Sequence, residues 1–195
     1  KYFVQVSKVF DGEVTELVAP TEFECKWLED YAIPVTNKND IFAFAQKVEK
    51  LRKATGATQK IYGVLAERLK YIEKSVELVP EVSLNLVRDV KQINDELNVM
   101  SILLFGDRTK SSRDVETENS ISENVGVIVW NMWRVRTEVT TTNKQLYEDA
   151  GKGLEEVLAK MKTAEEKIKV IETKLDELGT PYTPGRFEIP NWKLD

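Results

Sequence analysis

Apolar and polar side chains alternate with a period of two over the first 28 residues, which is typical of β-strands. The alternating apolar side chains are Tyr2, Val4, Val6, Phe23, Cys25 and Trp27. Between the two runs lies Asp11-Gly12, a pair that favours a hairpin turn because glycine tolerates positive φ. Two strands alone are only marginally stable, so we expect this hairpin to pack on other parts of the protein or to be the remnant of a β-sandwich. A sequence that opens inside a strand, without an initiator Met, is expected to come from a longer chain.

From Asn39 onward the apolar spacing changes to about 3.6 residues, which predicts amphipathic helices. The pattern predicts helices over 40–55 and 58–78, a third from Pro80 to Leu104, a fourth that begins after Ser120, and a fifth over 142–178. Gly56 is the predicted stop of the first helix, and Gly179 that of the last. The expected core positions are Ile41, Phe44, Ala45, Val48 and Leu51; Ile61, Leu65, Leu69, Ile72, Val76 and Val79; Val82, Leu86, Val90, Ile93, Leu97, Met100 and Leu104; Ile121, Val125, Ile128, Val129 and Met132; and Ala150, Leu154, Val157, Met161, Ala164, Ile168, Ile171, Leu175 and Leu178.

Three long apolar stripes with short connections predict antiparallel helices that cross at about 20°. The predicted fold class is mainly α: an antiparallel up-and-down bundle of long helices, preceded by a short β-hairpin or partial β-sandwich. The expected divisions are a hairpin and linker over 1–35, the bundle over 36–179, and an extended Pro-rich tail over 180–195. A long coiled-coil dimer is the alternative. Pro80 and the tight junction around it favour the intramolecular bundle, since the two helices that it separates bury each other's stripes.

The composition of the chain limits the chemistry that it can support. Of its 195 residues, 42% are apolar and 31% are charged, and the net charge of −5 disfavours nucleic-acid binding. The chain has no histidine, so it cannot assemble a Ser-His-Asp or Cys-His unit and lacks the commonest metal ligand. We expect no cofactor and no metal site. The lone Cys25 is interpreted as a buried structural thiol rather than a nucleophile. No run approaches ~20 consecutive apolar residues, so no membrane span is expected.

The stretch GDRTKSSRDVETENSISENVG, residues 106–126, holds carboxylates and arginines between two apolar helical stretches. Asp107, Asp114 and Glu116 have the chemistry of the paired carboxylates that perform acid–base work in glycosidases. Arg108 and Arg113 have the chemistry of a clamp for an anionic substrate. However, no spacing fixes two carboxylates at a working distance, and the mixed signs allow these groups to neutralise one another.

The end of this stretch has a structural interpretation, because Ser120 and Glu123 fit a helix-capping box. We therefore predict a helix-to-helix crossover in which Arg113 and Glu116 form a structural pair, and we assign no catalytic residue. Contact with a ligand is the alternative. The residues that would serve either role are Asp107, Arg113, Glu116 and Arg186.

Two further features have a structural and a functional interpretation. Trp130 and Trp133 would suit an aromatic platform for a sugar, but two tryptophans on an otherwise apolar helix are expected to lie in the core and at its rim. The last helix carries Glu–Lys pairs in the favourable i, i+4 order, which we interpret as a solvated face. Those pairs include Glu156–Lys160 and Glu165–Lys169.

Two blocks, LLFGDRTKSSRDVETENSISENVG and LDELGTPYTPGRFEIPNW, resemble the C-terminal end of large bacterial sortilin-like proteins with BNR/Asp-box repeats, often labelled glycosyl hydrolases or exo-sialidase-like. The matching residues are Gly106, Asp107, Arg113, Glu116, Thr117, Ser120, Ile121 and Val125, and then Gly179, Pro181, Thr183, Pro184, Gly185, Arg186, Pro190 and Trp192. The chain departs from the family pattern in four places. Val115 stands for Phe, Asn119 for Pro, Asn124 for Arg, and Tyr182 for Trp.

This resemblance implies that a long β-propeller and a small β-sandwich-like segment precede a helical tail. Catalysis or ligand binding would then belong to the propeller, since no Asp-box pattern occurs in this chain. The resemblance therefore implies a non-catalytic C-terminal accessory region of an exported protein, whose partners are upstream domains of the same polypeptide or a second copy. The alternatives are a glycosidase fragment that contributes to a glycan site and a helical protein-interaction module.

Overall fold

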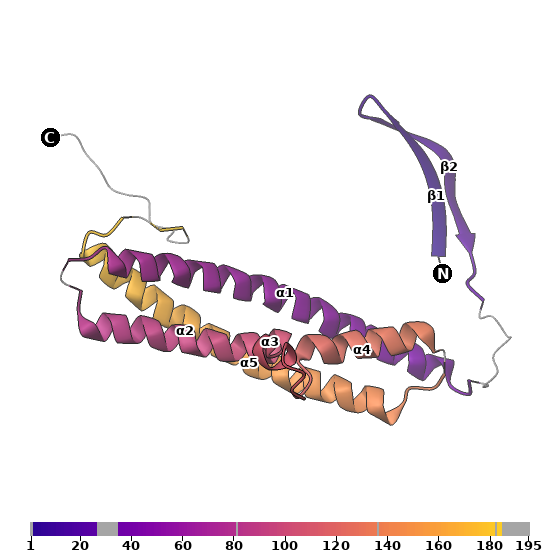
Figure 1. Cartoon of the computed structure of the whole chain (residues 1–195). Helices are drawn as coiled ribbons and strands as arrows, with labels where there is room; N and C mark the ends of the chain where they lie inside the picture. Colours follow the sequence, from indigo (N-terminus) through magenta and orange to yellow (C-terminus); the bar gives the residue numbers. More distant parts are fainter. Residues whose placement is uncertain (1, 27–34, 81, 136, 182, 185–195) are drawn as a thin grey trace. The chain divides into compact units, whose positions relative to one another are not determined.

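The computed structural model describes residues 2–26, 35–80, 82–135, 137–181 and 183–184. They form two compact units, a β-hairpin before residue 35 and a helical bundle from Val35 onward (Figure 1). The expected fold class, a mainly α protein with long bundled helices after a short hairpin, is confirmed. Within the described ranges, none of the helices combines the length and apolar character that crossing a membrane requires.

The hairpin consists of β1 (Tyr2–Phe10) and β2 (Glu13–Phe23), which pair antiparallel. Asp11 and Gly12 both have positive φ, 51° and 81°, so the predicted turn is of type I′, whose twist suits two strands. Cys25 follows β2 and is exposed, so the prediction of a buried thiol is wrong. The reason is that the sheet of the described residues has only two strands and offers no interior.

Among the described residues, two long helices run the full length of the bundle, and two shorter ones follow each other along its third side (Figure 1). The long helices are α1 (Lys38–Glu77) and α5 (Thr141–Glu177). The third side consists of α2 (Leu84–Phe105) and α4 (Ile121–Arg134), which both run antiparallel to the long pair. The single-turn helix α3 (Arg108–Ser111) lies in the crossover between α2 and α4. Both long helices contact both short ones, so one core extends along the whole bundle.

The predicted break at Gly56 is wrong, because α1 continues through this residue without interruption. A single glycine costs a helix interior only about 1 kcal/mol relative to alanine. The buried stripe outweighs that cost, since it passes through Leu51, Thr55 and Thr58 before reaching Leu65. The Thr58 hydroxyl also donates to the Ala54 carbonyl at 2.9 Å, one turn back. The two helices predicted over 40–55 and 58–78 are therefore one.

Most predicted core positions are buried, and they include every residue of the α2 stripe from Leu86 to Leu104 and of the α5 stripe from Ala150 to Leu175. Three predicted core positions are exposed instead: Ile61 (52%), Val129 (38%) and Leu178 (51%). Leu178 is the C-cap residue of α5 and lies beyond Leu175, the last buried residue of that helix. Ile61 and Val129 lie beside buried stripes rather than on them.

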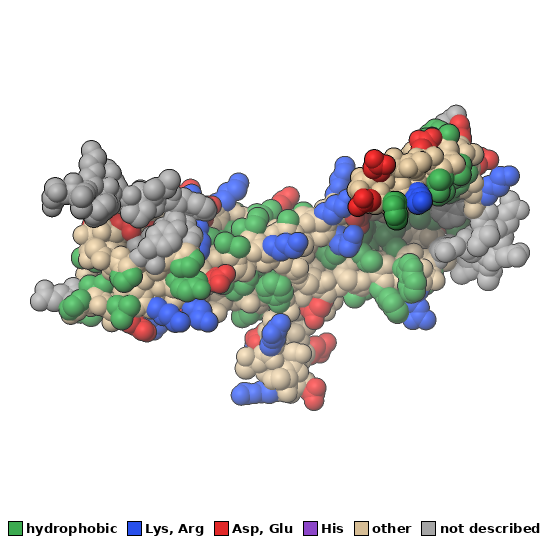
Figure 2. Space-filling model, turned by 90° about the horizontal axis from the view of Figure 1, so that it is seen from above, with side chains coloured by type: hydrophobic (Ala, Val, Ile, Leu, Met, Phe, Trp, Pro, Cys, Tyr) green, Lys and Arg blue, Asp and Glu red, His purple; other side chains and the backbone are tan. Residues whose placement is uncertain are grey.

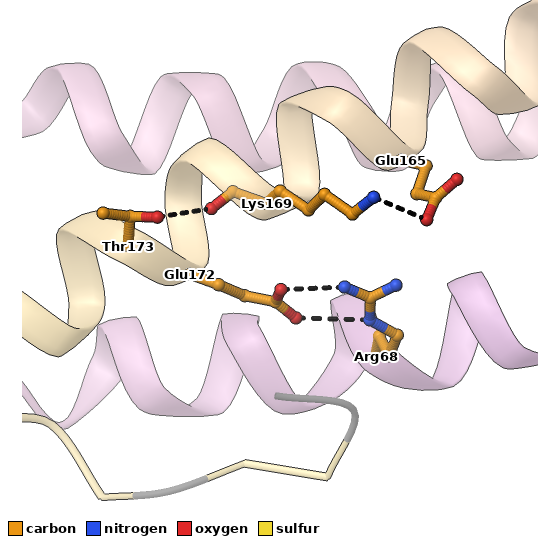
Figure 3. A network of polar contacts seen from close by, with 5 residues as sticks. All are labelled: Arg68, Glu165, Lys169, Glu172 and Thr173. Carbon is orange, nitrogen blue, oxygen red and sulfur yellow. Dashed lines mark hydrogen bonds and ion pairs between the residues drawn. The ribbon is translucent and has the colours of Figure 1, made fainter. Parts of the chain in front are cut away.

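A charged pair bridges the two long helices (Figure 3). The Arg68 guanidinium of α1 donates to both carboxylate oxygens of Glu172 of α5, at 3.2 and 2.8 Å. The two side chains are only 11% and 10% exposed. No sequence pattern predicted the position of Glu172. It lies next to the buried stripe, where the two hydrogen bonds from Arg68 satisfy its carboxylate.

Candidate functional site

The crossover between α2 and α4 is built from helix-terminal chemistry. Gly106 ends α2 with φ 87°, and its N–H donates to the Ile102 carbonyl at 2.8 Å. A side chain at this φ would be strained, so glycine suits the position. The Asp107 carboxylate then accepts the N–H groups of Thr109 and Lys110, at 3.0 and 3.1 Å. One oxygen of this predicted site residue is therefore engaged in capping α3.

The capping box at the start of α4 is present as predicted. The Glu123 N–H donates to Ser120 Oγ at 3.2 Å, while Glu123 Oε2 accepts from the Ser120 N–H at 2.7 Å and from the Ser120 hydroxyl at 2.8 Å. The bond from the Ser120 N–H is the main reason that the pKa of Glu123 lies below its ordinary value, and the bond from the hydroxyl adds to it.

A polar relay that the sequence does not indicate fixes the crossover to the bundle. Gln59 of α1 donates to Ser122 Oγ at 2.6 Å, and the Ser122 hydroxyl donates to the Leu104 carbonyl of α2. These bonds join α1, α2 and α4 at one point. Their members are far apart in sequence and of common types, so no local pattern could have identified them.

The predicted pair of Arg113 and Glu116 does not form. Both residues are exposed, and neither side chain makes an ion pair or hydrogen bond with any other residue in the described ranges. The chain turns between them at Asp114, whose φ is 52°. Two exposed charges gain little from pairing in water, so this turn is sufficient to leave them apart. Arg186, the fourth predicted site residue, lies outside the described residues.

Asp107 and Glu116 do line one groove of about 650 Å³, in which Arg113 takes no part. The crossover projects from the bundle in Figure 2, where acidic and basic side chains gather on it. Asn124, in the first turns of α4, also lines the groove and is only 7% exposed. In the sequence, Asn124 is distinguished only as a departure from the family pattern. The sequence feature that could have identified Asn124 is its position as a polar side chain directly beside the apolar stripe of α4.

The prediction that Trp130 and Trp133 lie in the core is wrong, because they are 53% and 73% exposed. Their rings contact each other with centroids 5.7 Å apart, and the Arg134 guanidinium lies 5.1 Å from the Trp130 ring centroid. Ile128 faces the core. Each residue advances the helix by about 100°, so Trp130, two residues later, lies on roughly the opposite side of α4.

These features define a helical-bundle protein with a separate hairpin and a charged crossover. Searches against protein-family models, curated proteins and solved structures found no match for the chain.

Proposed function

We propose that this chain is a non-catalytic accessory region of a larger exported, glycosyl-hydrolase-like β-propeller protein, and that it packs on or stabilises the upstream domain. The observation that carries the proposal is the hairpin, whose described residues are all exposed. Large apolar side chains lie on both of its faces, among them Phe10 at 72% and Val14 at 70% exposure. Contiguous exposed apolar surface of this kind is typical of an interaction site.

One face of the hairpin suits docking better than the other. Val6 and Val18 are cross-strand partners, and Tyr2 pairs with Phe23, with ring centroids 5.8 Å apart. The register shifts on either side of Val6 place their extra residues on β2, so alternation along β1 is undisturbed and Tyr2 and Val6 share one face. A two-stranded sheet has little stability alone, so covering this face with β-structure of the upstream domain would stabilise both partners.

The test uses the protein expressed from its complete reading frame. Val6→Lys combined with Val18→Glu puts a cross-strand ion pair in place of two valines, which helps to preserve the hairpin while making the docking face polar. We expect the thermal transition of the upstream domain to fall by several degrees, as it should when residues 1–34 are deleted. The thermal transition of the bundle, residues 35 onward, should not change in either variant. A reading frame without an upstream β-domain, or an unchanged upstream transition in both variants, would contradict the proposal.

A second candidate, a helical protein-interaction module, is favoured by the exposed Trp130–Trp133 pair. Exposed tryptophans beside an arginine have the composition of a binding hot spot. In this case self-association or partner binding should be lost in the Trp130→Ser, Trp133→Ser double variant, as measured by light scattering and analytical ultracentrifugation. This association should be unchanged by Val6→Lys and Val18→Glu, which distinguishes the interaction module from the accessory region.

A further inference from the structure

The groove beside the crossover has walls from four parts of the bundle. Its lining comes from the end of α2, the crossover, the first turns of α4 and a short stretch of α5. Leu103 and Ile121 supply apolar surface. Gly153 of α5 packs closely against Ile121: a Cβ atom added to this glycine would lie 3.1 Å from the Ile121 side chain. At about 650 Å³, the groove falls in the range of ligand sites, about 300–1,000 Å³.

Asn124 brings an unpaired amide to this groove. Its Oδ1 atom is inaccessible to solvent and has no hydrogen-bond partner among the described residues, although the residue is 93% buried (7% exposed). A buried carboxamide oxygen without a donor is costly, and folded proteins rarely leave one unsatisfied. A half-turn of the carboxamide exchanges its oxygen and its NH₂ group, so the same side chain can present an acceptor or a donor at one position. A peptide group suits this side chain, because it offers one donor and one acceptor.

The charges around the groove favour a cationic group. The lining includes four carboxylates, those of Asp107, Glu116, Glu118 and Asp149, and two cations, those of Lys110 and Lys152. Lys110 Nζ lies 3.8 Å from Asp107, so that cation is already balanced. Neither Glu116 nor Glu118 forms an ion pair or side-chain hydrogen bond with another described residue. The groove therefore has an excess of free carboxylate.

A short backbone segment at the rim of the groove has peptide groups without backbone hydrogen bonds. Residues 116–119 are neither helix nor strand, and their peptide groups make no backbone–backbone hydrogen bond within the described ranges. They are anchored directly afterwards by the Ser120–Glu123 capping box. An anchored segment with free peptide groups can pair with another chain at low entropic cost.

From this arrangement we infer that the groove binds an extended peptide segment with a basic side chain. The peptide's backbone pairs with residues 116–119, one of its peptide groups meets the Asn124 amide, and its Lys or Arg lies against Glu116 and Glu118. This binding site belongs to the bundle alone. It does not depend on the docking of the hairpin, and either proposal can fail without the other.

The test is a titration of the ¹⁵N-labelled chain with the peptide Ac-Ala-Val-Lys-Val-Ala-NH₂, followed by NMR. We expect shifts of the Asn124 side-chain NH₂ signals and of the backbone amides of 116–119. The same peptide with Glu in place of Lys should give smaller shifts or none. Glu116→Gln combined with Glu118→Gln should weaken binding several-fold and reduce its salt dependence, whereas Glu67→Gln, an exposed change on α1, should not.

The decisive variant is Asn124→Leu, which keeps the side-chain size but removes the amide. We expect about a tenfold loss of affinity, the effect of about one good hydrogen bond, with no fall in Tm. Thr55→Val is the matched control. Its hydroxyl oxygen is also buried and unpaired, at 4% exposure, but Thr55 does not line the groove. It should leave both Tm and binding intact.

Three outcomes would overturn the inference. One is the absence of shifts at millimolar peptide, and the second is unchanged affinity in Asn124→Leu. The third is an equal response to spermidine, since this would identify the site as one for amines rather than for a peptide.

Discussion

At the residue scale, helix-terminal chemistry explains two of the carboxylates in the segment that first suggested catalysis. Asp107 caps α3, and Glu123 closes the capping box of α4. Arg113 and Glu116 remain exposed and apart. The roles of Asp107 and Glu123 therefore follow from the N–H groups that donate hydrogen bonds to them. For Glu123 this role has a measurable effect on the pH dependence of stability.

We predict that Glu123→Gln lowers the free energy of unfolding by about 0.5–1 kcal/mol at pH 7, because a charged acceptor at a helix N-terminus is lost. The pKa of Glu123 is lowered in the folded state, so its contribution is complete above the ordinary value of 4.5 and disappears as the pH falls through the lowered value. Urea denaturation from pH 7 to pH 3 measures this effect. The free energies of unfolding of wild type and Glu123→Gln should converge only below about pH 4.5. Glu118→Gln, which removes an exposed charge outside any helix, provides the control. A difference between wild type and Glu123→Gln that does not shrink as the pH falls from 4.5 to 3 would contradict this assignment.

At the element scale, the continuity of α1 is the main departure from the predicted helices. A glycine between two helical stretches looks like a C-terminal stop, but Gly56 has no positive φ, unlike Gly106 and Gly179. The difference depends on whether the chain turns after the glycine. At Gly106 the crossover requires a turn, whereas at Gly56 the buried stripe continues.

Gly56→Ala is therefore expected to stabilise the protein by about 0.5–1 kcal/mol, since the added Cβ meets no atom within 4 Å and the unfolded chain loses freedom. The corresponding rise in Tm is about 1–4 °C for a protein of this size. Gly106→Ala is the contrasting variant and should destabilise it, because its φ of 87° is strained for alanine. A loss of stability in Gly56→Ala would indicate that α1 breaks there.

At the scale of the whole molecule, the bundle is held by one continuous apolar core together with a small number of polar bonds between helices. The Gln59–Ser122–Leu104 relay and the Arg68–Glu172 pair each join helices that are distant in sequence. Apolar stripes alone would tolerate sliding of parallel helices by a turn. A bidentate charged pair does not, so it favours one register of α1 against α5.

A double-mutant cycle on Arg68 and Glu172 measures this contribution. Arg68→Met or Glu172→Leu alone is expected to cost about 3 kcal/mol, because each leaves a nearly buried charge without its partner. The double variant should cost less than either single one, as measured by chemical denaturation. Glu165→Gln, which loses an exposed pair with Lys169, is the control and should change stability by less than about 0.5 kcal/mol. Additive single effects would show that the pair does not act as a unit.

Periodicity in the sequence was enough to determine the fold class and most of the core, while the Asp11-Gly12 pair determined the hairpin turn and the Ser120–Glu123 capping box determined the start of α4. Each of these depends on neighbours within one or two turns of chain, and local spacing records such neighbours directly. Only the tertiary structure decided that Gly56 lies inside a helix, that Trp130 and Trp133 face outward, and that Arg113 and Glu116 stay apart. It also brought Asn124 beside Glu116 and placed Arg68 opposite Glu172. These outcomes depend on which side of each helix is covered by segments far away in the chain, and no local pattern contains that information.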